Sequence, residues 1–293
     1  MQSDSTWATI VLYYPDETTV EYIAQLSSWI NLVVVDNTPC ISTRKMFGKE
    51  QYIVNGKNLG IAAALNQGMK FAQSRGASWC LLLDQDSRLS KVDIETLIIQ
   101  RNSLNSKRLA ILAPVYYCSN VGRFGDAISF EYGRLKRCAI SSNSFGSKLY
   151  PADYVISSGS LVNLSVCEEI GWHNEELFID FVDIDWGLRA KRHGYDIFLT
   201  NDVCMKHTIG DKPISIGKLK VVNHSPLRHY YYFRNVFFML RKKHVPLDWK
   251  VREVVKLPIR FILYAGFTEQ RLSHIKYMTK GMLHGIRGRF GAL

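Results

Sequence analysis

Residues 79–87 read Trp79-Cys80-Leu81-Leu82-Leu83-Asp84-Gln85-Asp86-Ser87, an unbroken apolar run that ends in two aspartates. Such a run, without alternation of polar and apolar residues, is typical of a strand buried on both faces in a parallel sheet. Ligands of open parallel sheets bind at the carboxyl ends of the strands. The stretch therefore predicts a central strand and, directly after it, one wall of a binding site.

The chain on either side of this strand alternates short apolar runs with helical patterns. This alternation is the signature of βαβ units, so we expect an α/β fold with a mostly parallel sheet. A third helix of this half begins at Ser90, where Asp93 completes a capping pattern. The other predicted elements are strands at 9–14, 32–35, 52–54 and 79–83 and helices at 18–30 and 61–74.

The second half reads less regularly. After a strand at 109–117 the residues 119–147 contain scattered Gly and Ser, and we expect a hairpin or a mobile loop over the site. Further predicted elements are an ordered stretch at 154–162, a helix at 165–170 capped by Ser165 and Glu168, a helix at about 182–193 closed by Gly194, a strand at 196–199, and helices from Ser225-Pro226 onward. We divide the chain into a domain of residues 1–215 and a helical region of residues 216–293.

The composition limits the class of protein. The chain has 293 residues, 47% of them hydrophobic, which is enough for a sizeable core. Its opening residues lack the basic and apolar segments of a secretory signal, so we expect the protein to stay in the cytoplasm. The six cysteines form no CxxC pair, and we expect neither a disulfide framework nor a zinc knuckle.

The net charge of +11 lies almost entirely in the C-terminal tail. Residues 241–293 hold 12 Lys/Arg against 3 Asp/Glu, whereas residues 1–240 hold 25 against 23. A basic tail suits a polyanion, either nucleic acid or the anionic leaflet of a membrane. The longest uncharged apolar run there, 261–267, is much shorter than the roughly 20 residues that span a bilayer, so membrane attachment would be peripheral.

Three predicted strands deliver polar residues to the same edge of the sheet. These are Tyr14-Pro15, Asp36-Asn37 and the pair Asp84 and Asp86. The set suits a nucleotide, with one carboxylate for the base or ribose and others for a metal on the diphosphate. A short Asp-x-Asp suffices because Mg²⁺ or Mn²⁺ takes one or two carboxylates together with phosphate oxygens. Each group taken alone is equally typical of a turn.

A second acidic cluster lies among large apolar residues at a predicted helix start. It contains Asp180, Asp183 and Asp185. Burial and mutual repulsion raise a carboxylate's pKa toward the range of a general base, and for Asp183 we favour catalysis. For Asp180 we favour a helix cap. His207 follows a strand and, paired with Asp86, would complete a metal site, although a lone His is more often a packing or surface residue.

Two familiar nucleotide motifs are absent from the sequence. Six residues separate Gly210 from Gly217-Lys218, and Leu219 follows, so this is no phosphate-binding P-loop. No GxGxxG follows any predicted strand. A dehydrogenase or a kinase is therefore disfavoured.

Together these motifs resemble one family. The ordered set Tyr-Tyr-Pro, Val-Asp-Asn, Asn-Leu-Gly-Ile-Ala, Leu-Asp-Gln-Asp-Ser, Ser-Gly-Ser-Leu, Phe-Ile-Asp-Phe-Val-Asp-Ile-Asp-Trp and His-Ser-Pro-Leu-Arg resembles the bacterial rhamnosyltransferases among the family 2 inverting glycosyltransferases. The resemblance covers about residues 7–240. It implies the GT-A fold, a Rossmann-like sheet flanked by helices, followed here by a basic helical appendage.

The resemblance also implies roles for single residues. Asp36 would contact the base or ribose, Asn58 would lie beside the nucleotide, and Asp84 and Asp86 would serve the diphosphate and the metal. Asp183 resembles the general base, although Val182 stands where the family often has Glu. His207 looks like the metal-supporting histidine. Three residues would lie near the pyrophosphate or acceptor: Arg228, Tyr231 and Arg234.

By the same resemblance the donor is dTDP-L-rhamnose and the acceptor a polyprenyl-diphosphate-linked saccharide of a surface polysaccharide such as O-antigen or capsule. A UDP-hexose stays open as the donor. The acceptor would bring the enzyme to the cytoplasmic face of the inner membrane, where the basic aromatic tail suits an interfacial helix.

Three alternatives stay open. The tail also fits an ordinary solvated face with packed aromatic residues. A nucleic-acid-binding protein would use the same tail but would leave the acidic clusters unexplained, so we expect no nucleic acid. A sugar-nucleotide binder without turnover would share the site.

Overall fold

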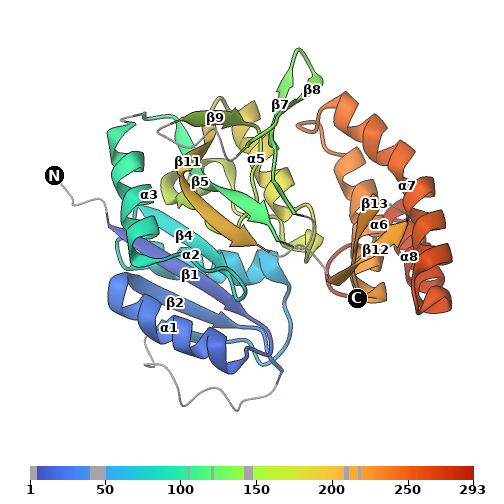
Figure 1. Ribbon diagram of the computed structural model, residues 1–293, viewed down its shortest axis with the longest axis horizontal. Helices are drawn as coiled ribbons and strands as arrows, with labels where there is room; N and C mark the ends of the chain where they lie inside the picture. The colour runs from blue at the N-terminus through green and yellow to red at the C-terminus, as the bar shows by residue number, and fades with distance from the viewer. Residues whose placement is uncertain are drawn as a thin grey trace.

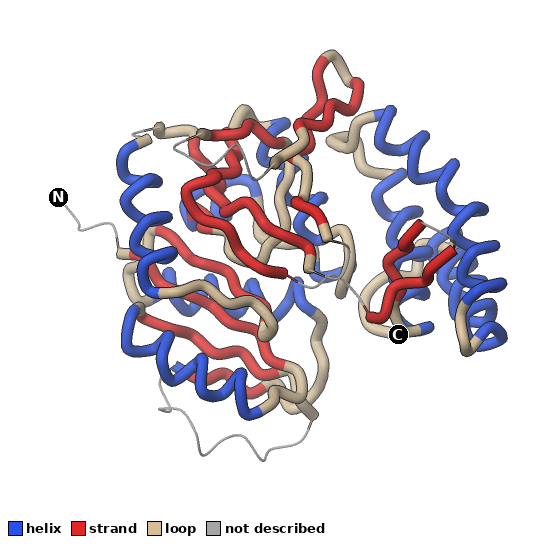
Figure 2. Tube along the Cα trace, in the orientation of Figure 1, coloured by secondary structure: helices blue, strands red, loops and turns tan. Residues whose placement is uncertain are grey.

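The computed structural model describes residues 5–39, 51–104, 106–119, 122–141, 148–207, 211–216 and 219–293 (Figures 1 and 2). Its centre is a sheet with the strand order β3-β2-β1-β4-β10-β5-β11-β9, and β6 pairs with β5. Pairing is parallel from β3 through β4 and between β5 and β11, whereas β10 and β9 run antiparallel to their neighbours. The predicted α/β class with a mostly parallel sheet is confirmed.

The first half follows the predicted βαβ order closely. Its elements are β1 (Thr6–Leu12), α1 (Glu17–Trp29), β2 (Asn31–Asp36), β3 (Tyr52–Val54), α2 (Ile61–Ser74), β4 (Trp79–Asp84), α3 (Lys91–Ser103) and β5 (Leu109–Cys118). Ser90 and Asp93 form the reciprocal capping box expected at the start of α3. Of the cysteines, Cys40 lies outside the described residues, and the five described ones are free thiols.

Helices cover both faces of the sheet. Because side chains alternate along a strand, Val33 and Val35 join the core under α2, α4 and α5, whereas Leu32 and Val34 join the core under α1 and α3. The central strand β4 contributes Cys80 and Leu82 to one core and Leu81 and Leu83 to the other. Burial on both faces explains its unbroken apolar run.

The second half contains more strands than the sequence pattern indicated. Its elements are β6 (Arg123–Phe124), β7 (Ala127–Glu131), β8 (Arg134–Cys138), β9 (Leu149–Ala152), β10 (Leu161–Asn163), α4 (Leu164–Ile170), a 3₁₀ turn (Glu175–Leu177), α5 (Val182–Arg192) and β11 (Asp196–His207). The β7–β8 hairpin falls within the predicted loop 119–147, of which residues 120–121 and 142–147 lie outside the described part.

Two local predictions were wrong. Asn163, not Ser165, caps α4, because the Asn163 side chain accepts a hydrogen bond from the Ser165 backbone nitrogen. The strand expected at 196–199 continues to His207, since a bulge after Thr200 lets β11 stay paired with β5. The extra length carries His207 to the carboxyl end of the sheet.

The C-terminal region packs as a separate layer (Figure 1). It contains a hairpin of β12 (Asp211–Ile216) and β13 (Leu219–Asn223), then α6 (Pro226–Leu240), α7 (Leu247–Phe267) and α8 (Arg271–Ile286). Ser225 caps α6 and Pro226 occupies its first turn, as the sequence predicted. The hairpin spans residue 216, where we placed the boundary between the two parts. No helix of the described residues has the length and apolarity to cross a membrane.

Candidate active site

The ends of β1, β2 and β4 are joined by hydrogen bonds at one edge of the sheet. The Tyr14 backbone nitrogen donates to Thr38 Oγ1 at 2.9 Å, and the Asn37 backbone nitrogen donates to the Leu12 carbonyl at 2.9 Å. Gln85, between the two aspartates after β4, accepts from the Tyr13 backbone nitrogen at 2.8 Å. The three polar segments predicted to meet at this edge do so.

The residues after β2 shape this edge. Asp36 is buried, and its carboxylate accepts from the Thr38 backbone nitrogen at 2.7 Å and from the Tyr52 hydroxyl. The Asn37 side-chain amide donates to the Gly60 carbonyl at 3.1 Å, and the Asn58 side chain accepts from the Gly60 nitrogen at 2.9 Å. Asp36, Asn37 and Asn58 thus form one ordered wall. Their contacts with a nucleotide, and those of Tyr14 and Pro15, stay predictions.

The loop after β4 places its two aspartates differently. The Ser87 nitrogen donates to the Asp84 carbonyl at 3.0 Å and closes a tight turn, and the Ser87 and Ser158 hydroxyls are hydrogen bonded. Asp86 is exposed, whereas Asp84 is partly buried. Burial, with the neighbouring charge of Asp86, raises the pKa of Asp84 to about 6. A buried carboxylate beside a second negative charge favours a bound cation.

His207 lies beside this loop. A β-bridge joins Arg88, directly after the loop, to Lys206, directly before His207. The His207 charge lowers the pKa of Asp84, and its buried Nδ1 has no hydrogen-bond partner. Within the described residues no group of three or more His, Cys, Asp or Glu is assembled for a metal. Asp86, Asp84 and His207 nevertheless fit a hard divalent cation that takes its other oxygens from a diphosphate and water.

Asp183 stands in the first turn of α5, partly buried beneath the sheet edge. Burial is the main cause that raises its pKa to about 6, and the charges of Asp180 and Asp84 add to it. Its Oδ1 accepts from the Ile184 nitrogen at 2.9 Å, and no Lys, Arg or His of the described residues forms an ion pair with it. Burial raises the pKa values of Tyr116 and Tyr154, and the charge of Asp183 adds to both rises. A carboxylate with these properties suits a general base.

The other two aspartates of the cluster have structural partners. Asp185 is buried and accepts from His244 Nε2 at 2.8 Å. Asp180 was expected to cap α5, and that prediction was wrong. The N-cap is Phe181, with no side-chain bond, and Asp180 instead pairs with Arg228 at 3.1 Å. Only Asp183 of the three lacks a cationic partner among the described residues.

The segment before Asp183 has an unusual backbone. Phe178, Asp180 and Phe181 have φ values of 65°, 63° and 65°. Residues other than Gly seldom adopt this region of positive φ. Each such residue costs on the order of 1 kcal/mol or more, so the surroundings must hold it. The Asn235 side chain does so by donating to the carbonyls of Leu177 at 2.8 Å and Ile179 at 2.7 Å.

The same segment touches the residues predicted to form the nucleotide wall. The Phe178 carbonyl accepts from the Ile61 nitrogen at 2.8 Å, at the start of α2. Gly60 has φ +85°, and a Cβ there would lie 2.5 Å from the Phe178 carbonyl oxygen. Glycine is therefore required where the Asn-Leu-Gly segment meets the acidic segment. This contact fixes the predicted nucleotide wall relative to Asp183.

The prediction for Arg234 was wrong. Its side chain is fully buried, and its guanidinium donates to the carbonyls of Glu176 and Leu177 at 2.9 Å and to the Gly291 carbonyl. It therefore holds backbone and has no donor directed at a pyrophosphate. Tyr231 is also buried, stacked on Phe178 with ring centroids 4.5 Å apart. Of these three, Arg228 pairs with Asp180 of the acidic segment at 3.1 Å, and its charge partly offsets the rise in the pKa of Asp84 that burial causes.

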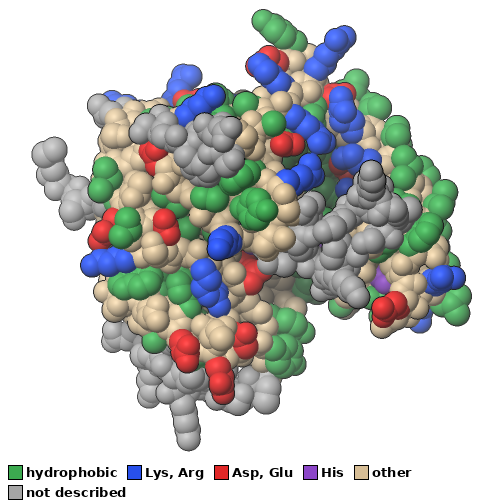
Figure 3. Space-filling model, viewed as in Figure 1, with side chains coloured by type: hydrophobic (Ala, Val, Ile, Leu, Met, Phe, Trp, Pro, Cys, Tyr) green, Lys and Arg blue, Asp and Glu red, His purple; other side chains and the backbone are tan. Residues whose placement is uncertain are grey.

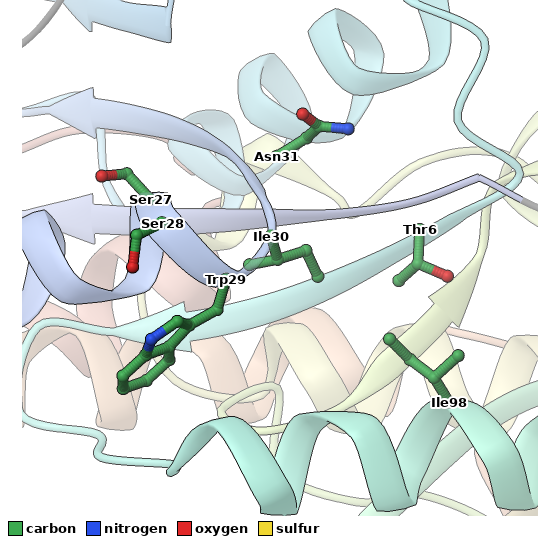
Figure 4. Close-up of a pocket in the computed structure, with 7 residues that line it drawn as sticks. All are labelled: Thr6, Ser27, Ser28, Trp29, Ile30, Asn31 and Ile98. Carbon is green, nitrogen blue, oxygen red and sulfur yellow. The ribbon is translucent and has the colours of Figure 1, made fainter.

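A shallow hollow of about 410 Å³ lies at the opposite edge of the sheet (Figure 4). Its lining includes Thr6 and Asn31, the first residues of β1 and β2, and Ile98 of α3. This is the amino end of the strands. None of its lining residues belongs to the site described above.

Sequence reasoning missed several residues of the site. Tyr116 and Tyr154 are near enough to Asp183 for its charge to add to the rise in their pKa values that burial causes, and Asn235 holds the strained segment before it. Asn235 follows Arg234 directly, but no local pattern marks an amide that will donate to a segment 55 to 58 residues earlier. For Tyr116 the sequence gave one indication of its position, because it lies near the end of the strand predicted at 109–117.

Comparison with known proteins gives consistent matches. The model of Glycosyl transferase family 2 matches residues 18–151. A curated relative, the dTDP-rhamnosyl transferase RfbF of Shigella flexneri, is 32% identical over 294 residues, which cover 99% of this chain and 98% of the relative. The low-salt glycan biosynthesis hexosyltransferase Agl10 of Haloferax volcanii is 24% identical over 96% of this chain and 91% of its own.

Solved structures agree with this at the level of the fold. A structure of GalNAc-T7 with UDP, GalNAc and Mn²⁺ matches with a TM-score of 0.55 at 10% identity, over 97% of this chain and 56% of that one. Residues 1–349 of TarS from S. aureus match with a TM-score of 0.53 at 14% identity, over 97% and 82% of the two chains. The predicted GT-A architecture is confirmed.

Proposed function

Because the chain belongs to the bacterial rhamnosyltransferases of glycosyl transferase family 2, we propose that it transfers L-rhamnose from dTDP-L-rhamnose to a saccharide carried on a polyprenyl diphosphate. The observation that carries the proposal is Asp183, a carboxylate with a pKa raised to about 6 and no cationic partner among the described residues, near the aspartates that follow β4. A UDP-hexose is the alternative donor, since a more distant relative is a hexosyltransferase.

The reaction needs a single displacement. An acceptor hydroxyl gives its proton to Asp183 while its oxygen forms a bond to the anomeric carbon, and the bond from that carbon to the diphosphate breaks with both electrons leaving on dTDP. One displacement inverts the anomeric configuration. The diphosphate leaves as a stabilised anion, so no second carboxylate is needed as an acid, in contrast to glycoside hydrolysis. Arg228 balances negative charge that develops on the leaving group.

Asp86 and His207 would hold the divalent metal, Mg²⁺ or Mn²⁺, with Asp84 beside the diphosphate. The bound ion would neutralise charge on the diphosphate oxygens. Two observations support this assignment: the unpartnered Nδ1 of His207 and the raised pKa of Asp84 beside Asp86. In the same proposal Tyr14, Pro15, Asp36, Asn37 and Asn58 form the nucleotide wall.

We further propose that residues 1–215 form the catalytic domain and that residues 216–293 hold the protein on the cytoplasmic face of the inner membrane. A polyprenyl carrier is embedded in the bilayer, so its saccharide is reached from the membrane surface. The excess of 12 Lys/Arg over 3 Asp/Glu in residues 241–293 supports attraction to anionic lipid. The product would be part of an O-antigen or capsule.

The test is turnover of dTDP-L-rhamnose and UDP-hexoses with a panel of lipid-diphosphate saccharides, with and without Mn²⁺ or Mg²⁺. We expect metal-dependent release of dTDP with transfer of rhamnose, lost on chelation and in Asp86→Ala. An exposed aspartate distant from the site, Asp196→Asn, is the matched control and should leave turnover unchanged. Tight binding of oligonucleotides with no sugar-nucleotide binding or turnover would refute the proposal.

A further inference from the structure

The outward face of α7 is apolar and has no partner among the described residues. Its inner side packs on the helical core through Trp249, Leu257 and Tyr264. The opposite side presents large apolar residues at helical spacing, with exposed fractions of 74% for Leu247, 52% for Val251, 57% for Val255, 54% for Ile259 and 67% for Ile262. A helix that is apolar on both sides is normally buried on both.

Basic residues border this apolar face, which we call the α7 outer face. Arg252 and Lys256 follow one another at four-residue spacing along one flank, whereas Arg260, four residues further on, stacks over the Tyr232 ring of α6. Arg252 and Lys256 pair with acids of α7 yet keep 48% and 39% of their side chains exposed. Apolar contact flanked by Lys and Arg is the pattern of helices that lie in a membrane interface.

The neighbouring helix α8 continues the pattern. Leu272, Leu283 and Ile286 are exposed on its outer side, interleaved with the exposed Lys276 and Lys280. Residues 271–293 contain five Lys/Arg and no Asp/Glu. Figure 3 shows hydrophobic side chains along the side of the molecule where Figure 1 places α7 and α8. A surface of this composition complements anionic lipid headgroups above an apolar interior.

From this juxtaposition we infer that α7 lies flat on the bilayer, with its outer face among the acyl chains and the basic rows of α7 and α8 at the anionic headgroups. The inference rests on the proposed function only in that a lipid-borne acceptor gives the contact its purpose. The inference names the residues of α7 that contact the membrane. The positive charge of the tail alone would not distinguish them from the rest of residues 216–293.

Docking through α7 also gives the active site a fixed relation to the membrane. The β7–β8 hairpin contacts α7 because the Leu135 nitrogen donates to Asp248 at 2.8 Å. On the inner side, Phe181 packs against Trp249 of α7 at 5.5 Å between ring centroids, two residues before Asp183. The helix that meets lipid therefore touches the segment that carries the base.

The experiment is flotation of the full chain with vesicles of phosphatidylcholine alone or mixed with phosphatidylglycerol. The test variant is Ile259→Glu/Ile262→Glu. The control is Val92→Glu/Ile99→Glu on α3, where both residues are 68% exposed. We expect the wild type and the control to float with the anionic vesicles and the α7 variant to lose roughly tenfold or more of its binding. Thermal melting checks that both variants are folded.

Two results would overturn the inference. One is flotation of the α7 variant equal to that of the control. The other is a wild type that does not bind vesicles and forms a dimer in solution that the α7 variant disrupts, because the outer face would then be an interface between two copies. Turnover with a short-chain, water-soluble acceptor separates the two proposals. The α7 variant should keep this turnover. A wild type that binds vesicles but turns over no acceptor would refute the proposed sugar transfer and leave the membrane inference standing.

Discussion

The sheet and the C-terminal helices distribute polar groups in opposite ways. The sheet buries mainly apolar side chains and places its carboxylates at the strand ends, as in β4, where Leu81 to Leu83 are buried and Asp86 is exposed. The helical region buries polar side chains, among them Arg234 and Asn235 at 0% exposure, and exposes Ile259 and Ile262. The two regions are therefore stabilised by different means.

The difference shows what each region contributes to the site. The sheet aligns its strands through backbone pairing, and the side chains of Thr38 and Gln85 join the ends of β1, β2 and β4. The segment before Asp183 adopts a costly backbone, and buried donors of α6 hold its carbonyls. The polar interior of the helical region thus fixes the position of Asp183, the proposed base, and its apolar exterior is left for contact outside the chain.

The largest expected effect is on the chemistry. Asp183→Asn keeps the shape of the side chain but cannot accept the acceptor's proton, so kcat should fall roughly 10³-fold, about 4 kcal/mol of barrier. Steady-state turnover of dTDP-L-rhamnose measures it, with Asp196→Asn as the control. Because the substitution leaves the sheet edge untouched, binding of dTDP should remain. Loss of dTDP binding in Asp183→Asn would mean that nucleotide binding at the sheet edge depends on the segment that the helical region holds.

The next effect tests the buried amide of α6. Asn235→Leu removes the donor to the Leu177 and Ile179 carbonyls and leaves buried acceptors unsatisfied, which should lower the free energy of unfolding by about 3 kcal/mol. Urea unfolding measures the loss. The exposed Asn102→Leu on α3 is the control and should change little. A variant as stable as the wild type would show that the strained segment is held by other contacts.

The same contrast explains how much of the fold could be predicted from the sequence. In the first half each element has a local signal: alternation, a cap at Ser90, a breaker at Gly76. The helix α2 was predicted with the bounds it has, 61–74. Short antiparallel strands such as β9 and β10 carry no comparable signal, because pairing with distant strands defines them.

For the site, the position of a residue could be predicted where a local pattern fixes it, whereas the chemical roles stay predictions. Asp84 and Asp86 follow an unmistakable strand, and Asp183 is an acid among apolar residues at a helix start. Arg234 misled because a motif that contains several arginines does not show which guanidinium faces solvent and which one binds backbone carbonyls. That depends on how α6 packs against residues 176–180, a contact between segments far apart in the chain.

A smaller effect concerns the stability cost of the base. The folded pKa of Asp183, about 6, lies above its ordinary value of 3.8, so its contribution to stability is present below pH 4 and is lost as the pH rises through 6. At pH 8 this loss corresponds to about 3 kcal/mol. Asp183→Asn should therefore be about 2–3 kcal/mol more stable than the wild type at pH 8 and gain little at pH 4, by urea unfolding. An equal gain at both pH values would argue against a buried charge.

The smallest effect links the two regions through the pH dependence of turnover. Asp183 must be ionised to accept a proton, so with a pKa of about 6 kcat/KM should fall roughly tenfold from its plateau by pH 5. The charge of Asp180 helps to raise that pKa, and Arg228 of α6 pairs with Asp180. Asp180→Asn removes the negative charge and frees a positive one, so the acidic limb should shift to lower pH. Measured at saturating metal, an unshifted limb would mean that the helical region positions Asp183 without tuning its pKa.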